Sequence, residues 1–417
     1  MKHYIFLQRV IGSGGVQCYI AAKTRYLEEN GWHVVVIGDN NPNTPQLCML
    51  PYLNKFIPNG NLYTYEHPDK LPYWLVNRVT RKMCETVGHV AAGEEVLIES
   101  WNSSTAMWGE LLAKRLHGRH LFWTANEYYR TPGNQYEPQM DFYLFKMRRG
   151  EILTSIDCVN RLFAGYKQYA KGDFIEFYMT EDPIQDVHFD KVDNLEKKDW
   201  NICYIGRSNK PYVPNIIKGV VDFANRHQDL QVQLILVGDA SSQNELLNAI
   251  KCENLIITKL GNLFPIPRNL YSKVDVVIAG SGSARHSVDE GALVVSTDVD
   301  TCRSHGILGY DTLDSISAQN PNADDLLDLS FEDALERALI TKEWLNKPFV
   351  WKKMPGIKEC IKRQKDIISK ATSDLEYYNE RKLLSGKTDW LLTLKCLLVF
   401  PIKEHMPQFV IKSLIKT

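Results

Sequence analysis

Two basic residues lie just beyond a short apolar run in the second half of the chain. The run from Asn201 to Ile205 ends at Gly206, and Arg207 and Lys210 follow it. A guanidinium offers a planar fork of donors and an ammonium a compact charge, so together they suit the oxygens of a diphosphate. The alternative is that both are solvated loop cations, and Lys218 in the following helical segment is a rival for the lysine role.

A second loop of small residues follows a later apolar run and precedes a helical segment. Its members are Gly280, Ser281, Gly282, Ser283, Ala284, Arg285 and His286. Small side chains let the amides of a helix N-terminus close on an oxyanion, and Ser283 is expected to cap this helix. We expect the loop to bind phosphate, with Arg285 adding positive charge on the first turn.

The first half of the chain carries two further candidates. Gly14 and Gly15 lie where the first apolar run turns into a helix, so an anion can approach the helix amides there. A glycine-rich turn without a ligand is the alternative, because G-S-G-G is not the complete dinucleotide motif G-x-G-x-x-G. Asn126 and Glu127 follow the apolar run that ends at Thr124. A carboxylate at this position can accept a proton from a hydroxyl or orient it, unless it is merely solvated or salt-bridged.

Short apolar runs alternate with helical segments through both halves of the chain. The runs are Tyr4 to Leu7, Trp32 to Ile37, Glu95 to Glu99 and Leu121 to Thr124, then Asn201 to Gly206, Val232 to Val237, Leu255 to Ile257, Val274 to Ala279 and Ala292 to Ser296. Continuous apolar runs are typical of parallel strands covered on both faces. The sequence therefore predicts an α/β chain with two Rossmann-like, doubly wound parallel sheets that face each other across a cleft.

The domain boundaries follow from the same alternation. We expect a first Rossmann-like domain over 1–185, a charged linker over 186–199 and a second Rossmann-like domain over 200–355. Residues 356–417 are expected to be helical, and Ser330 to Asp333 form a plausible helix-capping box before them. The segment 386–417 holds five lysines against Asp389 and Glu404, a net charge of +3, with many apolar residues. It either lies on an anionic membrane surface or packs back on the first domain.

Composition narrows the class of protein. The 417 residues carry 49 basic and 50 acidic side chains, so the basic excess usual for nucleic-acid binders is absent. The nine cysteines are scattered without a C-x-x-C pair, and no apolar run reaches the length of a membrane-spanning helix. We expect a cytoplasmic protein, located there or at the inner face of the membrane. Asp298 and Asp300 form a D-x-D sequence, which we interpret as a strand-end loop rather than a metal site.

The order of these motifs resembles that of the GT-B glycosyltransferases, most closely the retaining enzymes of glycosyltransferase family 4 (glycosyl transferases group 1). The residues that carry the resemblance are Gly14 and Gly15, Ile205-Gly206-Arg207 with Lys210, Val237-Gly238-Asp239, Val274-Asp275-Val276, and Glu290 to Asp298. It spans most of residues 1 to 345. It departs at the family's two glutamates, seven residues apart, where His286 takes the place of the second and Ile278 or Ala279 that of the first. Asn126, followed by Glu127, replaces a family histidine.

The resemblance implies an enzyme that moves a sugar from a nucleoside-diphosphate sugar to a hydroxyl of a glycan or lipid-linked glycan. It implies retention of configuration and a place in surface polysaccharide or glycoconjugate biosynthesis. We expect Asn126 and Glu127 to take the catalytic role, on the acceptor side. The expected donor-binding residues are Gly14, Gly15, Arg207, Lys210, Ser281, Gly282, Ser283, Ala284, Arg285, His286 and Glu290. No cofactor or metal is expected. The alternative is a GT-B protein that has lost catalysis and serves as a nucleotide-sugar-binding or scaffold module, and an NAD-dependent oxidoreductase is disfavoured by the incomplete dinucleotide motif.

Overall fold

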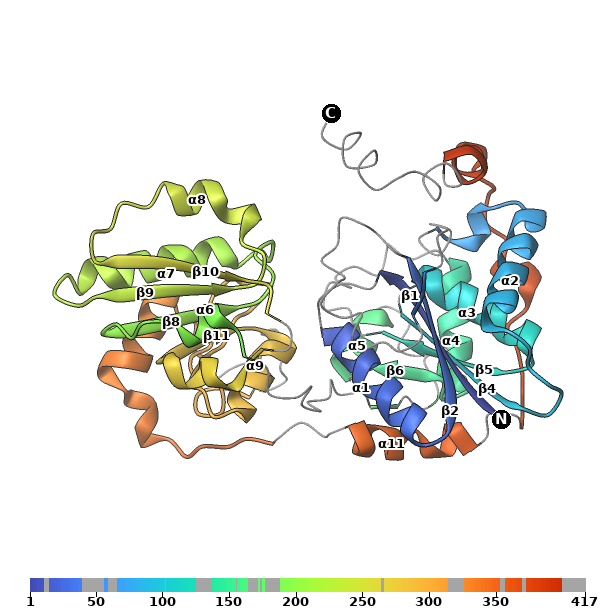
Figure 1. The fold of residues 1–417 in the computed structure, drawn as a ribbon, viewed down its shortest axis with the longest axis horizontal. Helices are drawn as coiled ribbons and strands as arrows, with labels where there is room; N and C mark the ends of the chain where they lie inside the picture. Colours follow the sequence, from blue (N-terminus) through green and yellow to red (C-terminus); the bar gives the residue numbers. More distant parts are fainter. Residues whose placement is uncertain are drawn as a thin grey trace. The chain divides into compact units, whose positions relative to one another are not determined.

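The chain folds into two compact α/β units, which are described separately. The computed structural model describes residues 1–10, 15–39, 56–58, 66–101, 103–124, 137–154, 156–163, 172, 175–176, 188–263, 266–313, 326–352, 357–369 and 373–399. The first unit comprises Met1–Thr180 together with Pro355–Thr417, and the second comprises Glu181–Met354 (Figure 1). The expected cleft between the two sheets stays a prediction.

The first unit is built on a seven-stranded parallel sheet with the strand order β3-β2-β1-β4-β5-β6-β7. Its strands are β1 (Lys2–Val10), β2 (Trp32–Asp39), β3 (Phe56–Pro58), β4 (Glu95–Trp101), β5 (Arg119–Trp123), β6 (Ile152–Thr154) and β7 (Ile175–Glu176). Its helices before the second unit are α1 (Gly15–Glu29), the 3-10 helix Pro68–Lys70, α2 (Tyr73–Val87), α3 (Ser103–Leu116), α4 (Glu137–Arg148) and α5 (Ile156–Leu162). The four apolar runs of this half are confirmed as strands, whereas β3, β6 and β7 are additional.

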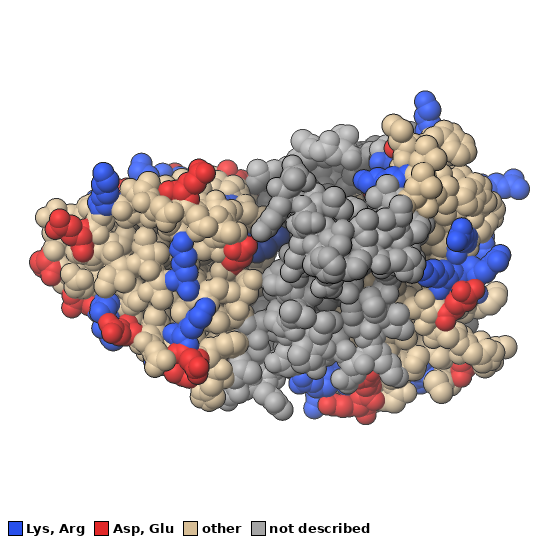
Figure 2. All heavy atoms as spheres, turned by 45° about the horizontal axis from the view of Figure 1, so that its top comes forward, with Lys and Arg blue, Asp and Glu red and all other residues tan. Residues whose placement is uncertain are grey.

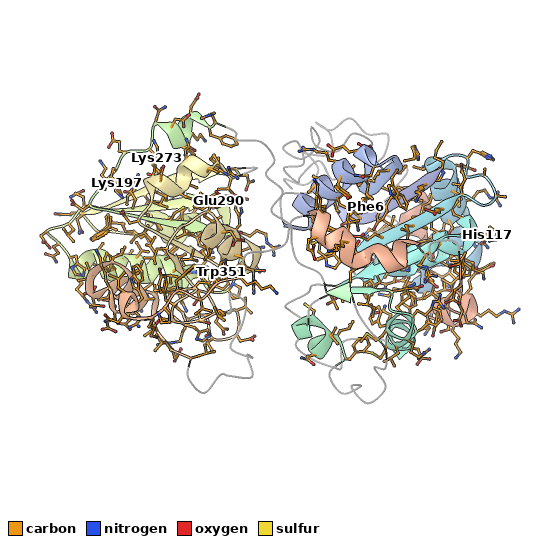
Figure 3. The ribbon with its side chains drawn as sticks, turned by 90° about the horizontal axis from the view of Figure 1, so that it is seen from below. Phe6, His117, Lys197, Lys273, Glu290 and Trp351 are labelled. Atoms are coloured by element: carbon orange, nitrogen blue, oxygen red, sulfur yellow. The ribbon has the colours of Figure 1, made fainter. Side chains whose placement is uncertain are left out.

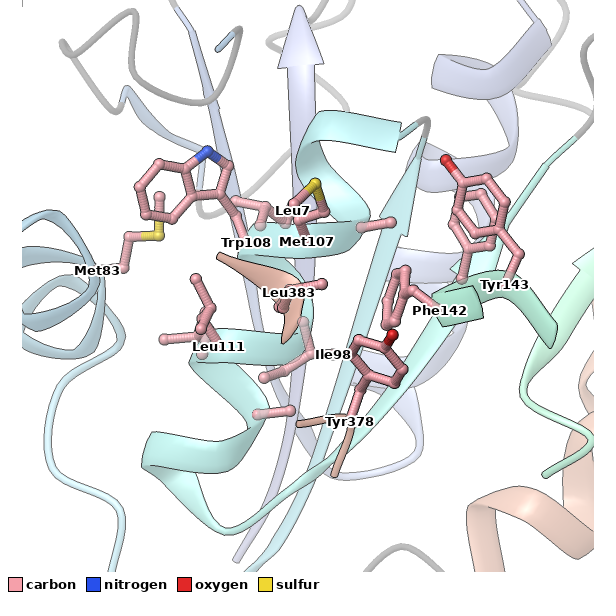
Figure 4. Close-up of a cluster of buried hydrophobic side chains, with 14 of the residues drawn as sticks. Leu7, Met83, Ile98, Met107, Trp108, Leu111, Phe142, Tyr143, Tyr378 and Leu383 are labelled. Carbon is pink, nitrogen blue, oxygen red and sulfur yellow. The ribbon is translucent and has the colours of Figure 1, made fainter. Parts of the chain in front are cut away.

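Alternation along the strands gives this sheet two buried faces. Ile5 and Ile98 point to one face, where they pack in the core with side chains of α2, α3 and α4 (Figure 4). Tyr4 and Glu99 point to the other face, where Lys23 of α1 meets them. Helices on both faces of a parallel sheet are the doubly wound architecture that continuous apolar strands predict.

The second unit has a five-stranded parallel sheet with the order β10-β9-β8-β11-β12. Its strands are β8 (Trp200–Ile205), β9 (Val232–Val237), β10 (Leu255–Gly261), β11 (Val276–Ala279) and β12 (Val294–Val295), which confirms all five predicted runs. Its α-helices are α6 (Asp190–Asp193), α7 (Val213–Arg226), α8 (Asn244–Asn248), α9 (Ser281–Asp289) and α10 (Phe331–Leu335), which continues as a π-helix over Glu336–Thr341. Its 3-10 helices are Ser241–Gln243, Arg268–Lys273 and Glu343–Asn346. The predicted cap of α10 is present, because the Ser330 hydroxyl accepts a hydrogen bond from the Asp333 amide at 3.0 Å.

Part of the segment assigned to a linker is packed on the second unit. Val192 of α6 is fully buried, and Leu195 joins it in a core cluster with Cys203 and Ile205 of β8. Lys197 also pairs with Asp275 at 2.5 Å. Residues 188–199 are thus part of the second unit, because two apolar side chains within the charged stretch pack into its core.

After the second unit the chain returns to the first. Helix α11 (Ile357–Ser369) is followed by α12 (Glu380–Leu383), α13 (Trp390–Leu394) and a π-helical continuation, Lys395–Val399. Tyr378, Leu383, Leu392 and Cys396 are buried in the core that also holds α2 and α3, and Figure 4 shows Tyr378 and Leu383 within it. One face of the described part of 386–417 therefore packs on the first unit, and residues 400–417 lie outside the described residues.

Buried charges connect helices α3 and α4 to strand β5. The ammonium of Lys146 donates to Glu110 Oε2 at 3.0 Å and to Glu151 Oε2 at 2.7 Å. His120 Nδ1 lies 3.0 Å from Glu110 Oε2, and Arg119 donates to Glu151 Oε1 at 2.8 Å. Each buried carboxylate thus faces a cation, which is the condition under which ionised groups tolerate burial.

The same network holds the returning chain in place. Glu110 Oε1 accepts a hydrogen bond from the Tyr378 amide at 2.8 Å, and Arg119 donates to the Ser373 carbonyl at 2.6 Å. Arg149 donates to the Asp374 carbonyl at 2.5 Å. Residues 373–378 are therefore fixed through their backbone by charged groups of the first unit. Charge-assisted hydrogen bonds of this kind are stronger than neutral ones.

We expect acid to destabilise the first unit in two stages. Burial and the Lys146 charge lower the pKa of His120 from 6.5 to about 4. Burial opposes ionisation of Glu110, but Lys146, His120 and the Tyr378 amide outweigh it and lower the pKa of Glu110 from 4.5 to about 2. Between the unfolded and the native pKa of each group, the unfolded chain binds a proton that the native state lacks. The free energy of unfolding therefore decreases as the pH is lowered, by up to about 1.4 kcal/mol per pH unit for each proton.

Urea unfolding at a series of pH values tests this expectation. The His120→Gln variant should lose the part of the pH dependence that lies between pH 6.5 and about 4. A wild-type stability that stays constant across that window, or a variant with the wild-type slope, would contradict it.

Candidate functional site

The carboxyl ends of β8 and β11 lie next to each other in the second unit. The two strands pair in parallel, with Ile205 opposite Ala279, so the loops that begin at Gly206 and Gly280 leave the sheet at the same level. The strand order also diverges here, since β9 lies on one side of β8 and β11 on the other. Such a switch point is where open α/β sheets bind their ligands.

The loop after β8 is held through its backbone and leaves one cation exposed. The Tyr204 hydroxyl donates to the Arg207 carbonyl at 2.9 Å, and Gln243 donates to the Ser208 carbonyl at 2.8 Å. The Ser208 hydroxyl donates to the Asp239 carbonyl after β9. The Arg207 side chain is exposed and makes no ion pair within the part of the chain that the structure describes. Lys210 is half-buried in the same loop.

Two glycines allow the turns after β8 and β9 to touch. Gly238 has φ 125° and donates its amide to the Gly261 carbonyl at 2.8 Å. A Cβ atom at this position would lie 2.2 Å from the Gly206 carbonyl oxygen, so only glycine fits. A small pocket lies between these turns and is lined by Tyr204, Gly206, Ser208, Val213, Ile217, Leu236, Val237, Gly238, Asp239, Ala240 and Gln243.

Helix α9 presents its N-terminus at the end of β11. The helix begins at Ser281, with Gly280 as the N-cap residue and without a side-chain cap. The prediction that Ser283 caps the helix is wrong, because Ser283 lies inside it and its carbonyl accepts from the Ser287 hydroxyl at 2.8 Å. The first-turn amides of a helix have no acceptor within the helix, so this end favours an anion.

The remaining predicted residues lie along α9. The Arg285 guanidinium lies over the ring of Trp351, 5.6 Å from its centroid, and Trp351 donates to Asp289 at 2.6 Å. Glu290 lies just past the helix end (Figure 3). Its carboxylate is 3.2 Å from the Arg268 guanidinium. The structure thus brings Arg207, Lys210 and the residues 281–286 to neighbouring strand ends of one sheet.

No protein-family model and no curated protein matches the chain. Among solved structures, sucrose-phosphate synthase from Thermosynechococcus elongatus aligns with a TM-score of 0.54 at 15% identity, over 96% of this chain and 99% of that one. HepE from Anabaena, solved with UDP and glucose, aligns with a TM-score of 0.52 at 12% identity, over 92% of this chain and 97% of HepE. A putative UDP-N-acetylglucosamine 2-epimerase from Listeria monocytogenes aligns with a TM-score of 0.52 at 12% identity, over 91% of this chain and 99% of the epimerase.

The chain has the GT-B fold. The two positions compared above with the glutamates of glycosyltransferase family 4 hold no carboxylate. Ile278 and Ala279, the candidates for the first glutamate, are fully buried in β11. His286, at the second, is half-buried, with its ring edge-on to Tyr271 at 5.9 Å. No described residue supplies a carboxylate at either position. Gly14, Asn126 and Glu127 lie outside the described residues, and Gly15 is the first residue of α1.

The D-x-D sequence forms a strand-end loop, as predicted, and its first carboxylate has an internal role. Asp298 is fully buried after β12 and accepts hydrogen bonds from the Asp300 amide at 2.6 Å and from His305 at 2.8 Å. Burial alone would raise the pKa of Asp298, but the bonds from His305 and the loop amides lower it overall. Both oxygens are therefore used to shape the loop.

A second arrangement in the first unit has the geometry of a catalytic triad. Ser100 Oγ lies 2.7 Å from His120 Nε2, and His120 Nδ1 lies 3.0 Å from Glu110 Oε2. All three residues are buried, with 2% exposure or less. Burial also keeps His120 neutral at physiological pH, with its pKa lowered to about 4. Because no substrate can reach a hydroxyl without exposed surface, we assign this trio to the structural network and not to catalysis. Nothing in the sequence marks it, since the three residues share no motif.

Proposed function

We propose that this GT-B protein is a glycosyltransferase whose donor, a nucleoside-diphosphate sugar, binds at the β8–β11 switch point of the second unit. The observation that carries the proposal is the exposed Arg207, without an ion-pair partner in the described residues, one strand away from the N-terminus of α9. In the proposed reaction, sugar transfer leaves charge on the departing diphosphate. Arg207, Lys210 and the amides around Ser283 would stabilise that charge. Electrostatic stabilisation of this kind is usually the largest single contribution to enzymatic rate enhancement.

The roles of the other candidates follow from the direction of the reaction. Arg285 would add charge near the diphosphate, and His286 and Glu290 would lie toward the donor sugar. Gly14 and Gly15 would line the donor from the first unit, and Glu127, with Asn126 beside it, would accept or orient the acceptor hydroxyl. The proposed acceptor is a glycan or lipid-linked glycan. We propose that no metal ion is needed, because side chains and amides supply the positive charge.

A second function, a module that binds nucleotide sugars without turnover, is favoured by the missing carboxylates at Ile278, Ala279 and His286. The putative 2-epimerase named above shares this fold, so an activity assay with UDP-sugars must identify the product as well as measure the rate at which it forms. UDP is the first ligand to test, because HepE was solved with it. A ligand at 100 times its dissociation constant should raise stability by about 2.7 kcal/mol, which a thermal-shift assay detects. Binding without any product from UDP-sugars and acceptors would select the module.

Replacing Arg207 by alanine should weaken UDP binding about 10- to 150-fold, because a charged hydrogen-bonding group contributes about 1.5–3 kcal/mol. Isothermal titration of the purified full chain measures this. The Lys251→Ala variant is a matched control. Lys251 is an exposed cation before β10, so it lies at the amino ends of the strands and not at the carboxyl ends where the site is proposed. Equal affinity in wild type and Arg207→Ala, or equal weakening in both variants, would refute the assignment of Arg207 to the diphosphate.

A further inference from the structure

An apolar face of the C-terminal segment lies in solvent. Helix α13 and its continuation bury Leu392 and Cys396 in the core of the first unit. On the other side, Trp390 is 65% exposed and Leu391 81%, and Leu394 and Leu398 are exposed by 52% and 60%. A soluble surface seldom gathers four large apolar side chains within nine residues, and such patches mark interaction sites.

The start of α2 extends this surface. The Asp389 amide, next to Trp390, donates to the Lys70 carbonyl at 2.8 Å, three residues before Tyr73. Tyr73 is 59% exposed and Trp74 is 50% exposed at the first turn of α2. Figure 1 shows the red C-terminal helix beside this end of α2. We call the six side chains the aromatic patch: Tyr73, Trp74, Trp390, Leu391, Leu394 and Leu398.

Positive charge borders the aromatic patch. The exposed stripe of α2 continues from Trp74 through Arg78, Arg81 and Lys82. Lys387 and Lys395 are exposed on the C-terminal segment. Against these five cations, α2 and residues 386–399 carry two acids, Glu85 and Asp389, so these two segments together have a net charge of +3 in a chain of net charge −1. Figure 2 shows basic side chains at this end of the first unit.

We infer that the aromatic patch and its basic border dock the first unit on an anionic membrane surface. Tryptophan and tyrosine favour the headgroup region of a bilayer, leucines enter the acyl boundary, and lysines and arginines meet the lipid phosphates. A protein partner with an acidic rim would use similar charges, but the pairing of indole rings with leucines on a short amphipathic helix fits the lipid interface best. Among the described residues, no helix is long and apolar enough to cross a membrane.

Co-sedimentation with vesicles tests the inference on the full chain. We expect binding to vesicles that contain phosphatidylglycerol, weaker binding at raised salt, and little binding to phosphatidylcholine alone. The Trp390→Ser/Leu391→Ser variant should lose at least about tenfold in partitioning, because it removes the two most exposed apolar side chains of the aromatic patch. The Arg78→Ala/Arg81→Ala/Lys82→Ala variant should lose about a hundredfold on anionic vesicles, since each cation near the surface strengthens binding about fivefold.

Two controls establish whether the aromatic patch itself is the anchor. The Leu345→Ser/Val350→Ser variant removes apolar side chains that are 62% and 54% exposed on the second unit, and it should bind as the wild type does. A chain ending at Val399 should also bind, which shows that residues 400–417 are not the anchor. Truncation at Ser385 is unsuitable, because it removes Leu392 and Cys396 from the core. Thermal unfolding should be the same in all point variants, since every changed side chain is exposed.

Three results would overturn the inference. They are wild-type partitioning by the Trp390→Ser/Leu391→Ser variant, equal loss in the second-unit control, and loss of binding in the chain that ends at Val399. A wild type that ignores anionic vesicles but dimerises through the patch in sedimentation equilibrium would overturn it in favour of a second copy of the chain. None of these outcomes bears on UDP affinity, because no side chain of the aromatic patch or its basic border is assigned to the donor.

Discussion

Replacing Lys146 by methionine should destabilise the first unit by about 3–5 kcal/mol, the usual cost of leaving a buried charge without its partner. Lys146 is 1% exposed and its ammonium contacts both Glu110 and Glu151. Methionine keeps most of the volume but removes the charge, so two carboxylates remain with less compensation. Urea unfolding of the full chain, followed by circular dichroism, measures the effect on the first unit's transition.

The matched control for this experiment is Lys114→Met. Lys114 also pairs with a carboxylate, Glu380 at 2.7 Å, but its side chain is 43% exposed. Exposed pairs contribute about 0–1 kcal/mol, so this variant should change little. Adding Glu110→Gln to Lys146→Met should recover part of the loss. If both lysine variants cost the same, the buried network does not hold the first unit together.

Replacing Gly238 by alanine should weaken UDP binding at least as much as Arg207→Ala does, and it should destabilise the second unit. The φ of 125° costs a side chain about 1–3 kcal/mol. The added Cβ, 2.2 Å from the Gly206 carbonyl oxygen, requires a shift of the turn that carries Arg207, at a further cost of about 1–3 kcal/mol. Because the carbonyl is backbone, no side-chain rotation relieves the contact, and the displaced loop no longer presents its cation beside α9.

Gly261→Ala separates the effect of the contact from that of the backbone angle. Gly261 also has a positive φ, 76°, but a Cβ there would meet nothing within 4 Å. This variant should lose about 1–2 kcal/mol of stability from the left-handed conformation alone and keep its UDP affinity. Isothermal titration and urea unfolding of both variants decide the matter. Unchanged UDP affinity in Gly238→Ala would show that the turn after β8 does not position the ligand.

The features set by local pattern were predictable from the sequence. Runs such as Trp32 to Ile37 and Val232 to Val237 are short and almost entirely apolar, which is the pattern of a parallel strand covered on both faces. Gly206, Arg207 and Lys210 could be predicted as loop residues because the end of a recognised strand shows where the following loop begins. Strands of two or three residues, such as β6 and β7, carry too little pattern to be recognised.

The features set by pairing across the fold were not predictable. Glu110, His120 and Lys146 meet from α3, β5 and α4, and no spacing along the chain indicates that they balance one another. The helix cap expected at Ser283 was wrong because Gly280 already occupies the extended N-cap position, three residues before Ser283. Likewise, Val192 and Leu195 reveal their role only through the core beneath them.

The return of the chain to the first unit reverses the usual order of folding during synthesis. Domains generally fold as units as they leave the ribosome, the N-terminal one first. Here the second unit is one continuous stretch, Glu181–Met354, whereas the core of the first still lacks Tyr378, Leu383, Leu392 and Cys396 when that stretch emerges. The Glu110 carboxylate also lacks its hydrogen bond from the Tyr378 amide until that later segment is synthesised. The later half of the chain can therefore reach its native state while the earlier half stays incomplete and needs protection from aggregation until translation ends.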